Sequence, residues 1–235
     1  MINPALNAVE LSESFARNKS IQIFDFLKED KANELHNWFS SDIPEDWWFT
    51  SIMNPSDEDY KGAMNIRHKP EAQELINIKI KEANEVFMNG SFSYVFDRSM
   101  THAAKCNCLE CQFNLFLKSD FMLFFIKTIT GVEISKTNEV FSSRYTAGQF
   151  LSPHHDKNKG KIGFVYSLSK GWRPEWGGNL HFMEEDYRTV TKTIVPVFNR
   201  LTMFDIPARD GVPHYVSHVL PYVETKRISI TGWFA

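Results

Sequence analysis

The sequence lacks any run of about 18 apolar residues, so it is not expected to contain a helix that spans a membrane or to have a membrane partner. Its first residues contain no basic segment followed by an apolar one, so we expect no signal peptide. Cysteine is scarce, with three residues in one short cluster, and this odd number does not suggest a disulfide framework. A reducing, cytoplasmic setting is therefore expected.

The sequence also has no strong excess of charge of one sign. Its 26 basic and 29 acidic side chains give a net charge of −3. No basic stripe is interleaved with aromatic residues, which argues against a nucleic-acid partner. No repeat or low-complexity linker divides the 235 residues, 43% of which are hydrophobic. Residues 1–235 are thus expected to form one domain with a sizeable core, in an oligomeric state that the sequence does not indicate.

The chain changes character near Gly131. Helical spacing predicts helices over residues 28–39, 71–88 and 113–130, with Leu75, Ile78, Ile80 and Ala83 forming the apolar stripe of the second. The apolar residues 121–126 are expected to be buried. A short strand is predicted at residues 20–26, and residues 44–49 could be a strand or a turn.

Segments after Gly131 are short, β-branched and aromatic, which is typical of a β-sandwich or closed barrel. We expect an α+β fold in which the mostly helical residues 1–131 buttress one face of a barrel-like core formed by residues 132–235. Eight strands are predicted there, at residues 139–145, 150–156, 161–167, 179–182, 189–196, 200–205, 215–219 and 227–234.

The sequence Ser-Pro-His-His-Asp at residues 152–156 could provide metal ligands. Residues i and i+2 of a strand face the same side, so His154 and Asp156 would lie together and His155 would point away. A third ligand from a distant strand would complete the arrangement of two histidines and one carboxylate used by non-haem Fe(II) oxygenases. The pattern alone also fits a partly exposed histidine followed by a solvated aspartate.

Two later segments could complete such a site. His214 and His218 have the same parity along a predicted strand, so strand direction does not choose between them. Arg227, Ser229 and Thr231 alternate with two isoleucines and would share one face of the last strand. A buried arginine and serine could bind a carboxylate, whereas an outer strand would place Arg227 in water.

The order His-x-Asp, distal His and Arg-x-Ser resembles the 2-oxoglutarate- and Fe(II)-dependent dioxygenases, in particular their prolyl 4-hydroxylase-like branch. Further resemblance lies in the strings at residues 143–148, with a tyrosine and a glycine turn, at 172–180, with Trp…Gly-Gly-x-Leu, and at 227–234. The resemblance covers roughly residues 113–235.

This resemblance implies a double-stranded β-helix, or jelly-roll. It implies that His154, Asp156 and His214 bind Fe(II), with His214 favoured over His218 because it begins a His-x-Val-x-x-Val pattern. Arg227 would pair with the distal carboxylate of 2-oxoglutarate, assisted by Ser229, with Tyr145 nearby. A second co-substrate tyrosine often found in the family is replaced by Ser167.

The implied activity is hydroxylation of an unactivated C–H bond with O2, converting 2-oxoglutarate to succinate, with ascorbate as an optional reductant. A prolyl residue of a peptide or protein is the favoured substrate. The alternatives are a free amino acid or other small metabolite and, in another class, a non-catalytic binding module with a degenerate barrel and a zinc-binding Cys/His cluster.

His102, Cys106, Cys108 and Cys111 lie within ten residues and could bind zinc. The Cys-x-Cys spacing is expected to crowd a tetrahedral site. The sequence therefore favours three reduced thiols over a zinc or redox site.

Overall fold

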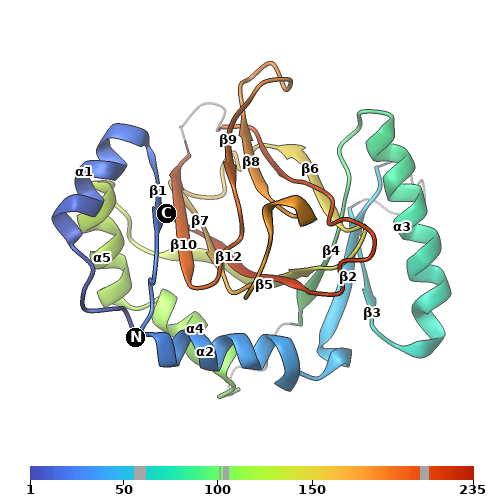
Figure 1. Cartoon of the computed structure of the whole chain (residues 1–235), viewed down its shortest axis with the longest axis horizontal. Helices are drawn as coiled ribbons and strands as arrows, with labels where there is room; N and C mark the ends of the chain where they lie inside the picture. Colours follow the sequence, from blue (N-terminus) through green and yellow to red (C-terminus); the bar gives the residue numbers. More distant parts are fainter. Residues whose placement is uncertain (56–61, 101, 103–105, 207–211) are drawn as a thin grey trace.

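One curled antiparallel sheet of twelve strands forms the centre of the molecule (Figure 1). The computed structural model describes residues 1–55, 62–100, 102, 106–206 and 212–235. The strands are β1 (Ser20–Ile23), β2 (Trp48–Met53), β3 (Ala63–Arg67), β4 (Tyr94–Ser99), β5 (Thr137–Tyr145), β6 (Phe150–His154), β7 (Ile162–Ser167), β8 (Leu180–Met183), β9 (Val190–Ile194), β10 (Arg200–Asp205), β11 (His214–Val216) and β12 (Arg227–Phe234).

The strand order is β1-β10-β7-β12-β5-β4-β6-β11-β8-β9, with β2 and β3 branching from β4. Strands that lie far apart in this order, β7 and β11 among them, line one cavity, so the sheet curls around it. The expected α+β class and barrel-like core are confirmed.

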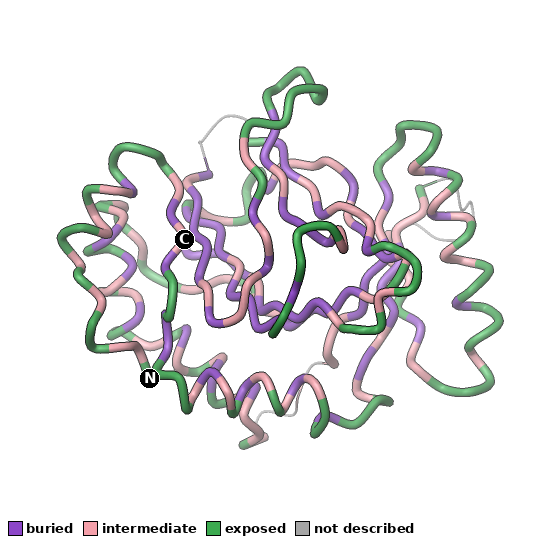
Figure 2. The backbone as a smooth tube through the Cα atoms, in the orientation of Figure 1, coloured by how far each residue is buried: buried purple, intermediate pink, exposed green. Residues whose placement is uncertain are grey.

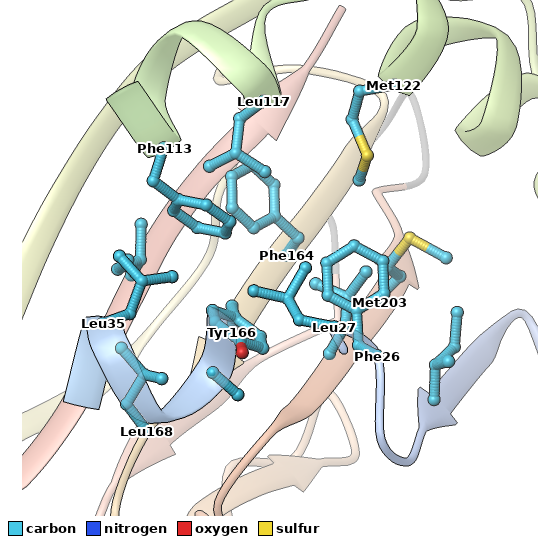
Figure 3. Packing of buried hydrophobic residues seen from close by; sticks show 14 of the residues in the cluster. Phe26, Leu27, Leu35, Phe113, Leu117, Met122, Phe164, Tyr166, Leu168 and Met203 are labelled. Atoms are coloured by element: carbon cyan, nitrogen blue, oxygen red, sulfur yellow. The ribbon is translucent and has the colours of Figure 1, made fainter. Parts of the chain in front are cut away.

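Four of the five helices in the described part of the chain cover the outer face of β1, β10, β7 and β12. The helices are α1 (Ala8–Asn18), α2 (Glu29–Asn37), α3 (Gln73–Met88), α4 (Leu109–Leu117) and α5 (Asp120–Thr130). Phe113 lies beside Tyr166, with ring centroids 5.4 Å apart, and Leu117 and Met122 belong to the same buried layer (Figure 3). Each fully buried large apolar side chain contributes about 1.5–3 kcal/mol, so this layer fixes the sheet against the helices.

Helix α3 lies apart from the other four and packs against β2 and β4 (Figure 1). The expectation that helices buttress only one face is therefore incomplete. The predicted stripe is also partly wrong, because Leu75 and Ile78 are 44% and 49% exposed, whereas Ile76 and Ala83 are buried. Apolar residues occur on several sides of this helix, so spacing alone did not identify the packed face. Buried and exposed positions alternate along it (Figure 2).

The single helix predicted over residues 113–130 is two helices, α4 and α5. Ser119 caps α5, because its Oγ accepts a hydrogen bond from the backbone N–H of Met122. Residues 121–126 are helical but not uniformly buried, since Phe121 and Phe124 are 60% and 71% exposed. The predicted glycine stop is present, with Gly131 in the left-handed conformation at φ 67°.

Several strands lie outside the part of the chain, after Gly131, in which the sequence predicted the sheet. Strands β3 and β4 lie in the part expected to be mostly helical, and β4 sits between β5 and β6 in the sheet. In contrast, β10 and β12 have the predicted bounds. The single-domain assignment of residues 1–235 remains a prediction. Within the described residues, no helix is long and apolar enough to cross a membrane.

Candidate active site

His154, Asp156 and His214 come together at one wall of the cavity inside the curled sheet. His154 and His214 are register partners on β6 and β11, and their ring centroids lie 4.4 Å apart. Nε2 of His154 is 3.6 Å from Oδ1 of Asp156, and Nε2 of His214 is 3.4 Å from Oδ2. Asp156 lies two residues beyond the end of β6, so the predicted strand was too long, although both side chains do face the cavity.

The two imidazoles are oriented in the same way by the backbone. Nδ1 of His154 lies 3.0 Å from the carbonyl oxygen of Ser152, and Nδ1 of His214 lies 2.9 Å from that of Val212. A carbonyl can only accept, so each Nδ1 donates to the backbone and each Nε2 is directed to the cavity beside Asp156.

The third member, Asp156, is held as a carboxylate. Burial raises its pKa, but the neighbouring imidazoles of His154 and His214 outweigh burial and hold the pKa well below its ordinary value. The indole N–H of Trp233 donates to Oδ2 of Asp156 over 2.9 Å. Burial, assisted by His214, lowers the pKa of His154 and favours its neutral form. Two imidazoles and one carboxylate are a donor set that fits Fe(II).

Arg227 lies in the same cavity with no carboxylate partner among the described residues. It is only 3% exposed. Its Nε donates to the Gly178 carbonyl over 2.6 Å, and its NH1 group donates to Ser229 Oγ over 3.0 Å. Burial lowers the pKa of Arg227, but arginine remains protonated in proteins. A buried cation without a counter-charge is a site for a small anion.

The surroundings of Gly178 explain why the second residue of the Gly-Gly string is glycine. It adopts φ +63°, and a Cβ there would lie 3.1 Å from Arg227 Cδ. A side chain at this position would press on the guanidinium that the Gly178 carbonyl holds, so glycine suits both the turn and the arginine.

Tyr145 and Ser229 also lie in the cavity. The guanidinium of Arg227 sits over the Tyr145 ring at 4.7 Å, and Ser229 Oγ is 3.0 Å from Ser143 Oγ. Burial raises the pKa of Tyr145 to about 12, so its phenol stays neutral at ordinary pH. The alternation predicted along the last strand is present: Arg227, Ser229 and Thr231 line the cavity, whereas Ile228 and Ile230 join the outer core.

The two other candidate histidines lie outside the three-residue cluster. His218 stacks on Phe150 with centroids 4.1 Å apart, and its Nε2 is 3.1 Å from Asn84 Oδ1. His155 directs its Nε2 to the Tyr187 hydroxyl at 2.5 Å. The geometry thus groups His214, not His218, with His154 and Asp156.

Sequence reasoning missed the wall that β4 contributes. Tyr94, Phe96 and Arg98 line the cavity of about 510 Å³, and Phe96 stacks on Tyr145 at 5.2 Å. Their two-residue spacing was the available signal. Ser167 is buried, whereas Tyr166 points into the helical layer and donates to Asn199 Oδ1 over 2.9 Å.

His102 and the three cysteines also lie close together. Ligand atoms of His102, Cys106, Cys108 and Cys111 all lie within 4.8 Å of one another. Cys108 directly precedes α4, and the first turn of this helix places Cys111 close to the other two cysteines. The expected crowding of the Cys-x-Cys pair around a tetrahedral ion stays a prediction.

A curled antiparallel sheet that encloses two histidines, one carboxylate and a buried arginine is the arrangement expected of double-stranded β-helix proteins that could hold non-haem iron. Residues 140–235 match the family model described as the 2OG-Fe(II) oxygenase superfamily. The matched segment carries all six of the cavity residues predicted from the sequence.

Two curated relatives share 30% identity with the chain over 114 residues. They are Prolyl 3-hydroxylase OGFOD1 of Mus musculus and of Xenopus laevis. The match covers 46% of this chain and 20% and 22% of the respective relatives, so the chain spans about a fifth of their length.

Solved structures share the fold over nearly the whole chain. A prolyl-4-hydroxylase of Pseudomonas putida aligns with a TM-score of 0.56 and 17% identity, covering 97% of this chain and 98% of that one. A 2OG-Fe(II) oxygenase family oxidoreductase from Burkholderia pseudomallei aligns with a TM-score of 0.59 and 11% identity, covering 100% and 92%. The expected double-stranded β-helix is confirmed by these likenesses.

Proposed function

We propose that this protein is a 2-oxoglutarate- and Fe(II)-dependent dioxygenase that hydroxylates a prolyl residue of a peptide or protein. One observation carries the proposal: a cluster of two histidines and one carboxylate shares a single cavity with a buried arginine that lacks a carboxylate partner among the described residues. A buried cation in this position suits a dicarboxylate co-substrate.

His154, Asp156 and His214 would hold the iron through two Nε2 atoms and a carboxylate oxygen. Three protein ligands leave positions open for other ligands. When bound, Fe(II) with 2-oxoglutarate and O2 supplies the oxidation of an unactivated C–H bond, releasing succinate and CO2. The Ser152 and Val212 carbonyls keep both imidazoles in the tautomer that ligation needs.

Arg227 would bind the distal carboxylate of 2-oxoglutarate. Its Nε is already engaged by Gly178, which fixes the plane of the guanidinium. Ser229 would orient the same group through its hydrogen bond, and Tyr145 would support it through its ring face. The surrounding apolar walls exclude water and strengthen the charge interaction.

The prolyl substrate is supported by the names of the curated relatives and by the cavity wall. Phe92, Tyr94 and Leu151 offer apolar and aromatic surface next to the metal cluster, which suits a pyrrolidine ring. The cavity of about 510 Å³ also has room for a free amino acid or small metabolite, so the substrate assay includes both classes.

The test is succinate release and product mass with Fe(II), 2-oxoglutarate and O2, using a library of proline-containing peptides, free proline and other amino acids. We expect succinate and a gain of one oxygen atom on a peptide prolyl residue. His214→Ala is expected to abolish succinate, whereas His218→Gln keeps it. Equal activity of both variants would contradict the ligand assignment, and oxygen gain only on a free amino acid would replace the prolyl substrate.

A further inference from the structure

A second group of potential ligands lies between β4 and α4, outside the cluster of His154, Asp156 and His214. It comprises His102, Cys106, Cys108 and Cys111. A tetrahedral zinc ion with ordinary bond lengths separates a thiolate sulfur from an imidazole nitrogen by about 3.6 Å. Nδ1 of His102 lies 3.6 Å from Cys106 Sγ and 3.9 Å from Cys108 Sγ. These separations are already close to those of a zinc site.

Glu110 supplies an independent observation. This carboxylate is 2% exposed, and its Oε2 lies 2.8 Å from Nε2 of His102. Its Oε1 accepts from the hydroxyls of Ser99 and Ser142 over 2.5 and 2.6 Å. The carboxylate therefore holds a proton on His102 Nε2 and leaves the Nδ1 lone pair facing the sulfurs. A carboxylate behind a histidine in this way is a usual feature of zinc sites.

Backbone donors at the start of α4 face two of the three sulfurs. The backbone N–H of Cys108 points to Cys106 Sγ, and that of Cys111 points to Cys108 Sγ. The N-terminus of a helix also attracts negative charge. Backbone donors would thus stabilise thiolates at Cys106 and Cys108.

We propose that His102, Cys106, Cys108 and Cys111 bind one zinc ion that joins the end of β4 to the start of α4. Soft sulfur ligands favour zinc at this site, whereas the imidazole and carboxylate ligands of His154, Asp156 and His214 suit iron. Arg98 and Phe141 border both the cavity beside the cysteines and the cavity with that cluster. Zinc would therefore hold the β4 wall in place. The proposal does not depend on the oxygenase activity.

Cobalt(II) titration tests the site, because thiolate ligation to tetrahedral cobalt gives a near-ultraviolet charge-transfer band and intense visible bands. The full chain carrying His154→Ala and Asp156→Ala serves as the background, so that the other cluster contributes nothing. We expect one cobalt per chain with thiolate bands that zinc abolishes. Cys108→Ser and Cys111→Ser are expected to reduce the bands strongly, and Glu110→Gln to weaken metal affinity about 10–100-fold.

Either of two spectroscopic results would overturn the proposal. One is cobalt binding without thiolate bands, and the other is a spectrum unchanged by Cys108→Ser in a variant that keeps the circular dichroism of the parent. A measurement on the unsubstituted chain guards against misfolded variants: a thiol reagent should react slowly with all three cysteines when zinc is present and rapidly after a chelator is added. Equal rates would mean three ordinary reduced thiols.

Discussion

At the scale of single residues, the site depends on backbone carbonyls that orient the side chains of its histidines and its arginine. Two backbone carbonyls set the tautomers of His154 and His214, and the Gly178 carbonyl holds Arg227. None of these contacts follows from residue spacing. The ligand types could be predicted from His-x-Asp and the distal histidine, but the choice of His214 over His218 rested on resemblance until geometry separated them.

Trp233 offers a test of this orienting role. Replacing it with phenylalanine keeps an aromatic ring beside Phe141 but removes the N–H that donates to Asp156. We expect Trp233→Phe to fold and to bind Fe(II) about 10–100-fold more weakly, because Asp156 loses the partner that fixes it. Anaerobic metal titration measures the change. Trp176→Phe, which changes an indole outside the residues that line the cavity, serves as the control, and equal affinity in both variants would show that the indole contact is dispensable.

At the scale of elements, a buried charge network joins β4 to β5. Asp97 accepts from Arg144 Nε over 2.8 Å and from Thr50 and Gln149 over 3.0 Å. Arg144 also lies over the Trp48 ring at 4.5 Å. This network lies on the opposite face of β4 from Tyr94 and Phe96, so it positions the strand that walls the cavity.

Asp97→Asn is expected to lower the free energy of unfolding by about 3–5 kcal/mol at neutral pH, because it leaves Arg144 buried with reduced charge compensation. Asp97 is 1% exposed. Burial raises its pKa, but His68 and Arg144 outweigh burial and lower it below the ordinary 3.8. The stabilisation is therefore complete above about pH 4 and is lost as the pH falls through the lowered value.

Denaturant unfolding between pH 7 and pH 2 measures this effect. The difference between the wild type and Asp97→Asn should shrink below about pH 4. A difference that stays constant to pH 2 would contradict the assigned charge pairing. Asp30→Asn, at an exposed position in α2, serves as the matched control and is expected to change stability little.

The elements also show which sequence signals suffice to predict the bounds of a helix or strand. Strand β12 has its predicted bounds because polar and apolar residues alternate and each face meets a different environment. The break between α4 and α5 was hidden by an apolar run, and only the Ser119 cap marks it. Strand β4 was missed because its partners, β2, β5 and β6, come from distant parts of the sequence.

At the scale of the whole molecule, the curled sheet makes one cavity from both parts of the chain. The barrel segment supplies His154, Asp156, His214 and Arg227, and the earlier strand β4 closes the cavity wall beside them. The fold class and the polar centre of the cavity were predictable from the order of motifs. The aromatic wall and the assembly of His102 with the three cysteines depend on tertiary distances that spacing does not encode.

The central claim is that Fe(II) and 2-oxoglutarate bind together at this cavity, with Arg227 as the anchor. Anaerobic titration of 2-oxoglutarate into the Fe(II)-loaded protein tests it through the visible metal-to-ligand absorption of the chelate. The account predicts a band in the wild type and in the surface control Arg173→Ala, and at least a tenfold weaker 2-oxoglutarate affinity in Arg227→Ala. No band in the wild type, or unchanged affinity in Arg227→Ala, would contradict it.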